Sequence, residues 1–303
     1  MKKYLFLFAT LIVATSASAQ FYVSASGGFS VGSAGVVTGT SLNTTQTEAT
    51  NEYGSYGEGA NFQLRVGKMF NETFGLEIGL AYLHGADQVI DSYKLSSTNV
   101  VTEVVKGTAH ARAFGLTAAL VYNFNQNIYG KFGAITKVGG KTEAEFMRSS
   151  TTPFGPIVAE GAQDFHGRIP LGFTATMGYK YKLADNLNLF AEVEYLGINV
   201  TRDNSEFTKM SIVTPNVPAN SFYAGSPAVP SKTWLLGDAP YLWLSEVPGL
   251  PASSIVPIYA PTEITYEDTL ANPNPDPSKA LSSVAPYSSI GINFGITYTF
   301  GKK

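Results

Sequence analysis

The chain has 303 residues, no cysteine, and 20 basic against 23 acidic residues, which gives a net charge of −3. The absence of cysteine excludes a disulfide-rich scaffold and a lipidated N-terminal cysteine, and the weak charge shows no nucleic-acid-binding footprint. Because no run of about 18 apolar residues occurs, helical membrane spans are excluded as well.

Residues 1–19 have the pattern of a secretory signal peptide. Lys2 and Lys3 precede an apolar run, and small residues precede Gln20. We predict cleavage after Ala19. Removal of the two lysines leaves 18 basic and 23 acidic residues in the exported domain, residues 20–303, a net charge of −5.

The exported domain contains segments in which apolar residues alternate with small or polar ones, the period of a β-strand. In the clearest hairpin, two such arms surround the turn at Asn71 and Glu72. Arg65 and Glu77 are equidistant from Asn71, so we expect them to lie opposite each other. The predicted strands are 21–29, 59–69, 74–83, one ending at Phe124, 128–138, 169–181, 187–195 and 288–300.

The connections between these eight strands alternate between short and long. Short turns fall near Asn71, Gln126 and Asp185, and we expect long loops at 31–58, 84–110, 141–166 and 203–286. An even number of strands with short turns on one side and long loops on the other is typical of outer-membrane barrels. The sequence therefore predicts an all-β fold: an eight-stranded antiparallel up-and-down transmembrane β-barrel with long extracellular loops. Residues 84–110 alternate in part, so a hairpin there should project above the membrane.

Aromatic residues support the barrel because they fall on the apolar parity near the strand ends, where membrane barrels carry aromatic girdles. The girdle near the short turns comprises Phe21, Phe74, Tyr122, Phe124, Tyr179, Tyr181, Tyr298 and Phe300, and Phe29, Tyr82 and Tyr195 lie near the other end.

Three segments carry a family resemblance: Gly172–Tyr181, Leu189–Tyr195 and the aromatic terminal strand Ile292–Phe300. With these segments the chain resembles the small outer-membrane barrels of the OmpA/OmpX type, as found in Bacteroidetes-like β-barrel domain proteins. The resemblance covers 20–202 and 287–300. It implies insertion into the outer membrane, with contacts to lipid and to the barrel-insertion machinery through Phe294, Tyr298 and Phe300.

Six charged residues share the inward parity of the predicted strands. A charge facing lipid at the midplane costs about 2–4 kcal/mol, so we expect them in the lumen as a salt-bridge network. The network either plugs the barrel or forms a gated ion or proton path. Its members are Arg65, Glu77, Lys131, Lys180, Glu192 and Glu194.

The three histidines, His84, His110 and His166, fall near the external strand ends. No nucleophile, base and orienting group occur around them with recognisable spacing. We therefore predict rim histidines without a catalytic or metal-binding role, no cofactor, and no enzyme activity.

Residues 203–286 hold 13 of the 16 prolines and both tryptophans, so they are not expected to form ordinary barrel wall. The segment could cap the barrel mouth, form a partner-binding surface, or add a hairpin that makes ten strands. The candidate contact residues are Trp234, Leu235, Leu236, Tyr241 and Trp243.

These patterns favour a non-enzymatic surface barrel, a scaffold whose long loops bind an extracellular protein or glycan. The alternative is a narrow channel or carrier for small hydrophobic solutes, which would require a continuous lumen or a lateral opening.

Overall fold

A computed structural model of the chain describes residues 20–33, 35–43, 48–97, 100–221, 224–225, 227–236, 262–276 and 278–300. Three predicted features lie outside these residues: the signal peptide at 1–19, Tyr241 and Trp243. Within the described ranges, no helix is long and apolar enough to cross a membrane. The strands are β1 (Gln20–Gly32), β2 (Val36–Leu42), β3 (Ala49–Gly54), β4 (Gly59–Met69), β5 (Phe74–Gly85), β6 (Gln88–Ser97), β7 (Val100–Asn123), β8 (Ile128–Thr152), β9 (Gly155–Gly167), β10 (Gly172–Ala184), β11 (Leu187–Gly197), β12 (Asn199–Thr214), β13 (Lys232–Leu235), β14 (Glu263–Glu267), β15 (Lys279–Leu281), β16 (Val284–Pro286) and β17 (Ser289–Thr299).

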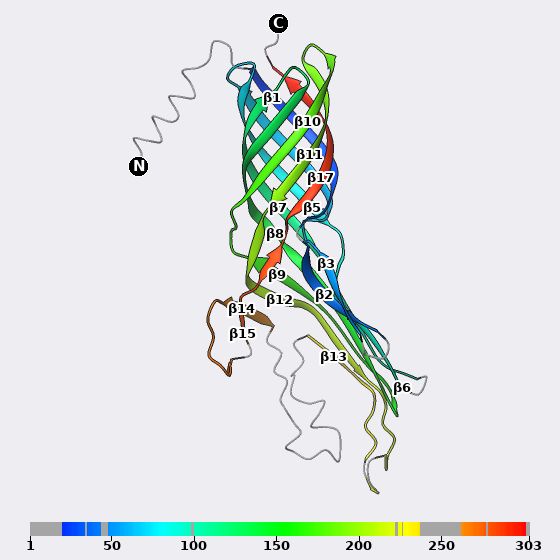
Figure 1. The fold of residues 1–303 in the computed structure, drawn as a ribbon. Helices are drawn as coiled ribbons and strands as arrows, with labels where there is room; N and C mark the ends of the chain where they lie inside the picture. The colour runs from blue at the N-terminus through cyan, green and yellow to red at the C-terminus, as the bar shows by residue number, and fades with distance from the viewer. Residues whose placement is uncertain are drawn as a thin grey trace.

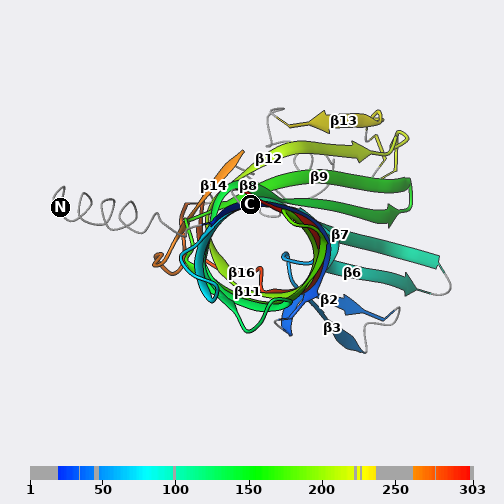
Figure 2. The same ribbon diagram turned by 90° about the horizontal axis from the view of Figure 1, so that it is seen from above.

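Eight of these strands close into a ring, which confirms the predicted barrel. Each strand pairs antiparallel with the next in the order β1–β4–β5–β7–β8–β10–β11–β17, and β17 pairs back with β1. Figure 2 shows this ring from above as a closed circle. The interpretation of 203–286 as two additional barrel strands is wrong, because β11 pairs directly with β17.

The side chains of the ring alternate as the sequence pattern requires. On β4, Phe62 and Leu64 point outward and are 58% and 63% exposed, whereas the intervening Gln63 is 6% exposed. An aliphatic or aromatic layer therefore covers the outside of the barrel, and polar side chains fill much of the inside. A soluble protein rarely leaves so large an apolar band uncovered.

The register of the β4–β5 hairpin differs from the prediction. Arg65 pairs with Gly79, and Glu77 pairs with Gly67, so the two charged residues are offset along the strands. The turn is centred one residue later than expected, because the side chain of Asn71 accepts hydrogen bonds from the backbone N–H groups of Thr73 and Phe74.

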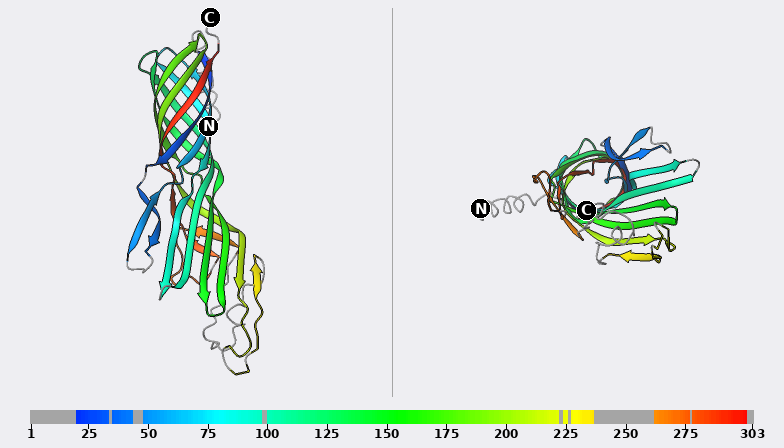
Figure 3. Two further views of the ribbon diagram at one scale, coloured as in Figure 1. Left: turned by 90° about the vertical axis from the view of Figure 1, so that its right-hand side faces the viewer. Right: turned by 90° about the horizontal axis from the view of Figure 1, so that it is seen from below.

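A second sheet projects from the outer end of the barrel, the end opposite the short turns (Figures 1 and 3). This outer sheet has the order β3–β2–β6–β7–β8–β9–β12–β13. The expectation of loops at 31–58 and 141–166 is therefore wrong, since these ranges contain β2, β3, β9 and part of β8. Within 84–110, β6 pairs with β7 as a projecting hairpin. Within 203–286, β12, β13, β14, β15 and β16 are strands.

Two long strands belong to both sheets. The second half of β7 pairs with β5 in the barrel and its first half with β6 in the outer sheet, while β8 pairs with β10 and then with β9. A register shift at Phe114 and Gly115 lies where the strands leave the barrel. Such bulges bend strands. Gly140, next to this shift, has a φ of 91°, and a Cβ there would lie 1.9 Å from the carbonyl oxygen of Arg112.

The lumen holds two kinds of packing. Charged and amide side chains occupy the half near the short turns. An apolar cluster occupies the outer half, and Tyr56 and Tyr287 close it with ring centroids 5.9 Å apart. Tyr287 follows β16, so the end of the proline-rich segment lies in the barrel mouth. The other members of the cluster are Ala109, Ala111, Ala113, Ile135, Ala144, Ile198, Val200 and Ala285.

Candidate functional site

The centre of the lumen is an ion pair between Arg65 on β4 and Glu192 on β11, which are 3% and 2% exposed. Both terminal nitrogens of the guanidinium contact the carboxylate, one of them Nη1 at 3.1 Å from Oε2. Arg65 also donates to Gln63 Oε1 at 2.9 Å and to Ser26 Oγ at 3.0 Å. The planar guanidinium satisfies several acceptors at once, which a lysine could not do.

A second cation joins this pair to Glu77. Lys131 Nζ lies 2.8 Å from Glu77 Oε1 and 3.5 Å from Glu192 Oε2. Arg65 Nη1 is 3.9 Å from Glu77 Oε1, so Glu77 is a secondary partner of Arg65 rather than its main one. Two cations and two carboxylates thus compensate each other, and we call Arg65, Glu77, Lys131 and Glu192 the ion cluster.

Tyrosine hydroxyls complete the ion cluster. Tyr22 donates to Glu77 Oε2 at 2.9 Å, and Tyr129 donates to Glu192 Oε2 at 2.7 Å. A buried carboxylate is stable only when its lone pairs are satisfied, and these hydroxyls fill that role. Sequence reasoning did not assign them to the network, although their position on the inward parity of β1 and β8 is the signal that could have identified them.

The two remaining members of the predicted network lie beside the ion cluster. Glu194 accepts hydrogen bonds from Gln63 Nε2 at 2.6 Å and Asn293 Nδ2 at 3.0 Å. Lys180 donates to Asn123 Oδ1 at 3.0 Å and lies 4.5 Å from the ring centroid of Tyr129. The structure thus brings four of the six residues into direct ion pairs and connects the other two through amides and an aromatic ring.

The histidines lie at the outer end in different environments. Both ring nitrogens of His110 face carboxylates, Nδ1 at 2.9 Å from Asp87 and Nε2 at 3.0 Å from Glu143. Glu143 also contacts Lys141 at 2.8 Å, and the bond with Lys141, followed by that with His110, holds the pKa of Glu143 below its usual value. His84 on β5 pairs in register with Arg112, not with His110. In the described part of the chain, no cluster of three potential metal ligands occurs.

The candidate contact residues lie at one edge of the outer sheet. Trp234 and Leu235 belong to β13, which pairs with β12, and Leu235 is 57% exposed. Lys232 Nζ lies 3.3 Å from the Trp234 ring centroid. The Leu236 backbone N–H donates to the Met210 carbonyl, so the chain here continues along β12.

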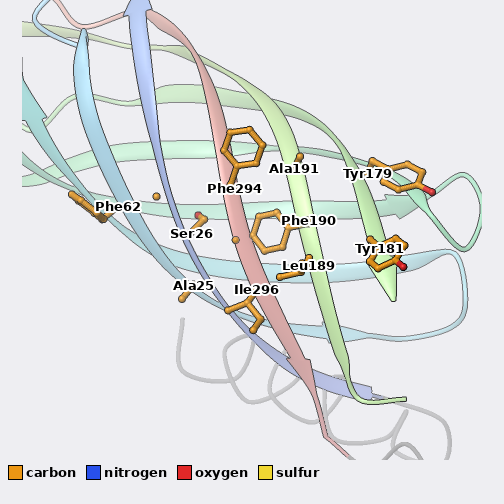
Figure 4. Close-up of a pocket in the computed structure, with 12 residues that line it drawn as sticks. Ala25, Ser26, Phe62, Tyr179, Tyr181, Leu189, Phe190, Ala191, Phe294 and Ile296 are labelled. Atoms are coloured by element: carbon orange, nitrogen blue, oxygen red, sulfur yellow. The ribbon is translucent and has the colours of Figure 1, made fainter. Parts of the chain in front are cut away.

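The terminal strand β17 and Phe300, the residue that follows it, present the aromatic residues that the resemblance implicates in membrane insertion. Phe294, Tyr298 and Phe300 point outward and are 64%, 42% and 51% exposed. Phe294 borders an open groove of about 620 Å³ on the barrel wall (Figure 4). Small residues such as Ala25 and Ala191 allow the wall to recede between larger side chains. The rim of the groove includes Phe62, Tyr179, Tyr181, Leu189 and Ile296.

Comparison with known proteins connects this barrel to a family. The model of the outer membrane protein beta-barrel domain matches residues 5–214. Among solved structures, the chain is similar to Ail, the attachment invasion locus protein of Yersinia pestis, solved with the heparin analogue sucrose octasulfate. The identity is 12% and the TM-score 0.32, with coverage of 93% of this chain and 99% of that chain.

The chain is also similar to a major outer membrane protein from Thermus thermophilus, with 13% identity and a TM-score of 0.35. That alignment covers 93% of this chain and 100% of the other. A search of curated protein sequences gave no significant match.

Proposed function

The chain belongs to the outer membrane protein beta-barrel domain family, and on that premise we propose that this outer-membrane barrel is a non-enzymatic binding scaffold. In this proposal the signal peptide directs export, and both ends of the barrel chain lie in the periplasm. The outer sheet then faces the extracellular space and binds a protein or glycan.

The observation that carries the proposal is the continuity of the outer sheet with the barrel wall. Because β7 and β8 run without interruption from one sheet into the other, the outer sheet is held rigidly above the membrane. Its edge strands are β3 and β13, each paired on one side only within the described residues. An open strand edge can accept an extended segment of another protein through backbone hydrogen bonds.

The side chains at these edges fit a binding role. Tyr53 on β3 is 62% exposed, and Leu235 on β13 is 57% exposed. Exposed aromatic and aliphatic residues on a polar sheet are typical of interaction surfaces. We therefore keep Trp234, Leu235 and Leu236 as the contact residues of this proposal, together with Tyr241 and Trp243, which lie outside the described residues.

The test is a binding screen with the full chain folded in lipid nanodiscs against arrays of extracellular matrix proteins and glycans. We expect a saturable hit that Leu235→Ser weakens at least tenfold. Leu281→Ser on β15 is the matched control, because Leu281 is 61% exposed but lies away from β13. Equal loss with both variants, or no saturable hit, would argue against binding through this edge.

A further inference from the structure

The outer half of the lumen contains a cavity of about 70 Å³. Residues of β1, β4, β5, β7, β8, β11 and β12 line it, and its side toward the barrel wall includes the outward-facing Phe114. Toward the ion cluster the cavity meets Gln63, whose amide is already bonded to Arg65 and Glu194. The apolar lining includes Ala81, Leu83, Ala113, Ile135, Ile198 and Val200, together with Tyr82, Phe114, Leu196 and Tyr287.

One cation faces this cavity without an acid beside it. Lys137 on β8 lines the cavity, and its Nζ lies 5.5 Å from the ring centroid of Tyr287. Within the described part of the chain, no carboxylate forms an ion pair with Lys137. A half-buried ammonium group among apolar side chains is poorly solvated, and an anion placed next to it would be strongly attracted.

A second hollow next to the cavity also carries a basic side chain. A smaller hollow of about 10 Å³ shares Lys137 and Val200 with the cavity and is lined by Arg202 and His166. The guanidinium of Arg202 lies 4.6 Å from the Phe165 ring centroid. No aspartate or glutamate occurs among the described residues that line either hollow. Clustered charges of one sign in a confined space raise the local concentration of the opposite ion.

A buried amide also lies on the wall of the cavity. Asn61 is 7% exposed, and its Nδ2 donates to Ser30 Oγ at 3.0 Å. Its Oδ1 has no hydrogen-bond partner within the described structure. Buried amide oxygens are rarely left unpaired, and because Oδ1 is an acceptor we expect it to bind a donor such as an ordered water rather than the carboxylate of a ligand.

We propose that this cavity, which we call the outer chamber, binds a short-chain aliphatic monocarboxylate with its carboxylate at Lys137 Nζ and its alkyl chain among Ala113, Ile135 and Ile198. The size of the chamber sets the length of the ligand. At about 10–15 Å³ for each water-sized position, 70 Å³ holds roughly five such positions, which corresponds to an acid of about four carbons. This proposal does not depend on the binding role of the outer sheet.

The experiment is equilibrium dialysis of labelled butyrate against the full chain folded in nanodiscs. We expect saturable binding at one site and no saturable binding of n-butylamine, which has a similar size and the opposite charge. Lys137→Gln should weaken butyrate binding at least tenfold, whereas Lys137→Arg should retain most of it. Lys182→Gln is the matched control, because Lys182 pairs with the exposed Asp185 at the short-turn end.

A second variant tests the chamber without removing a charge. A Cβ at Gly115 would lie 3.5 Å from Ile135 Cδ1 and 3.7 Å from Ala81 Cβ, which are ordinary contacts, so Gly115→Ala should fold normally. The added methyl group shortens the chamber, and we expect it to weaken butyrate binding more than propionate binding. Heat-modifiable migration in gels verifies that each variant is folded.

Three results would overturn the proposal: no saturable butyrate binding, equal affinity of butyrate and n-butylamine, or equal butyrate affinity in Lys137→Gln and Lys182→Gln. If Lys137→Gln does not fold, the butylamine comparison and Gly115→Ala still decide the question.

Discussion

The substitution Arg65→Met tests the ion cluster directly. Methionine approximates the length of the arginine stem but removes the charge, and among the described residues it leaves the buried Glu192 an ion pair with Lys131 alone, at 3.5 Å. The ion cluster then holds one cation and two carboxylates. Breaking a buried ion pair by removing one partner costs about 3–5 kcal/mol, because the remaining charge is poorly solvated.

The structure favours the lower end of this range. Lys131 and the hydroxyl of Tyr129, which donates at 2.7 Å, continue to stabilise Glu192 after the arginine is removed. We therefore expect a loss of about 3 kcal/mol in the free energy of unfolding, which is roughly a hundredfold increase in the unfolding constant. Urea titration of the protein folded into lipid vesicles, followed by gel migration, measures this difference.

Two further variants test whether the loss of stability in Arg65→Met comes from the unpaired buried charge. The double variant Arg65→Met/Glu192→Leu restores charge balance, because Lys131 still pairs with Glu77 at 2.8 Å, so it should be more stable than the single variant. Lys182→Met removes an exposed ion pair and should cost less than about 1 kcal/mol. If Arg65→Met costs no more than Lys182→Met, the ion cluster does not stabilise the barrel as we argue.

The folded chain should pass little current in planar bilayers, because the ion cluster fills the lumen; a steady open-pore conductance would instead support the channel alternative. Gly140→Ala should destabilise the junction of the two sheets by about 1–3 kcal/mol in urea titrations, since φ is 91° there. The lowered pKa of Glu143 means that its ion pairs stabilise the outer sheet above about pH 4.5 and are lost as the pH falls below that value. The protection factors of the β8 amides, which correct for the pH dependence of intrinsic exchange, should therefore fall between pH 6 and pH 3, and Glu143→Gln should reduce that difference.

The barrel could be predicted from the sequence because its alternation has one apolar and one polar face. On β4 the apolar Phe62, Leu64 and Val66 mark the outward parity, and a shift by one residue would place Arg65 in lipid. The strands of the outer sheet have no such contrast between an apolar and a polar face. In Ala49–Gly54, and in most of Gly155–Gly167, both faces are polar or mixed, so the period of two is hidden although the backbone pairs fully.

The sequence predicts which charged side chains face the lumen, but not which of them pair with each other. Inward parity identifies Arg65 and Glu192 separately, but they are 127 positions apart and meet only because β4 and β11 face each other across the closed ring. The local register was missed by two residues because the Asn71 side chain shifts the centre of the turn. Long-range pairing therefore depends on ring closure, which no local pattern contains.

Lys131 and Lys137 show how the same parity produces two different environments. Both point inward from β8, and six residues of strand separate them by about 20 Å. Lys131 reaches two carboxylates in the ion cluster, whereas Lys137 faces an apolar wall beyond the layer formed by Gln63 and Glu194. Gln63 thus forms the floor of the outer chamber, and the ion cluster lies beneath it. In our proposal, a small anion that enters the outer chamber meets this layer and leaves by the way it came, which the conductance measurement tests.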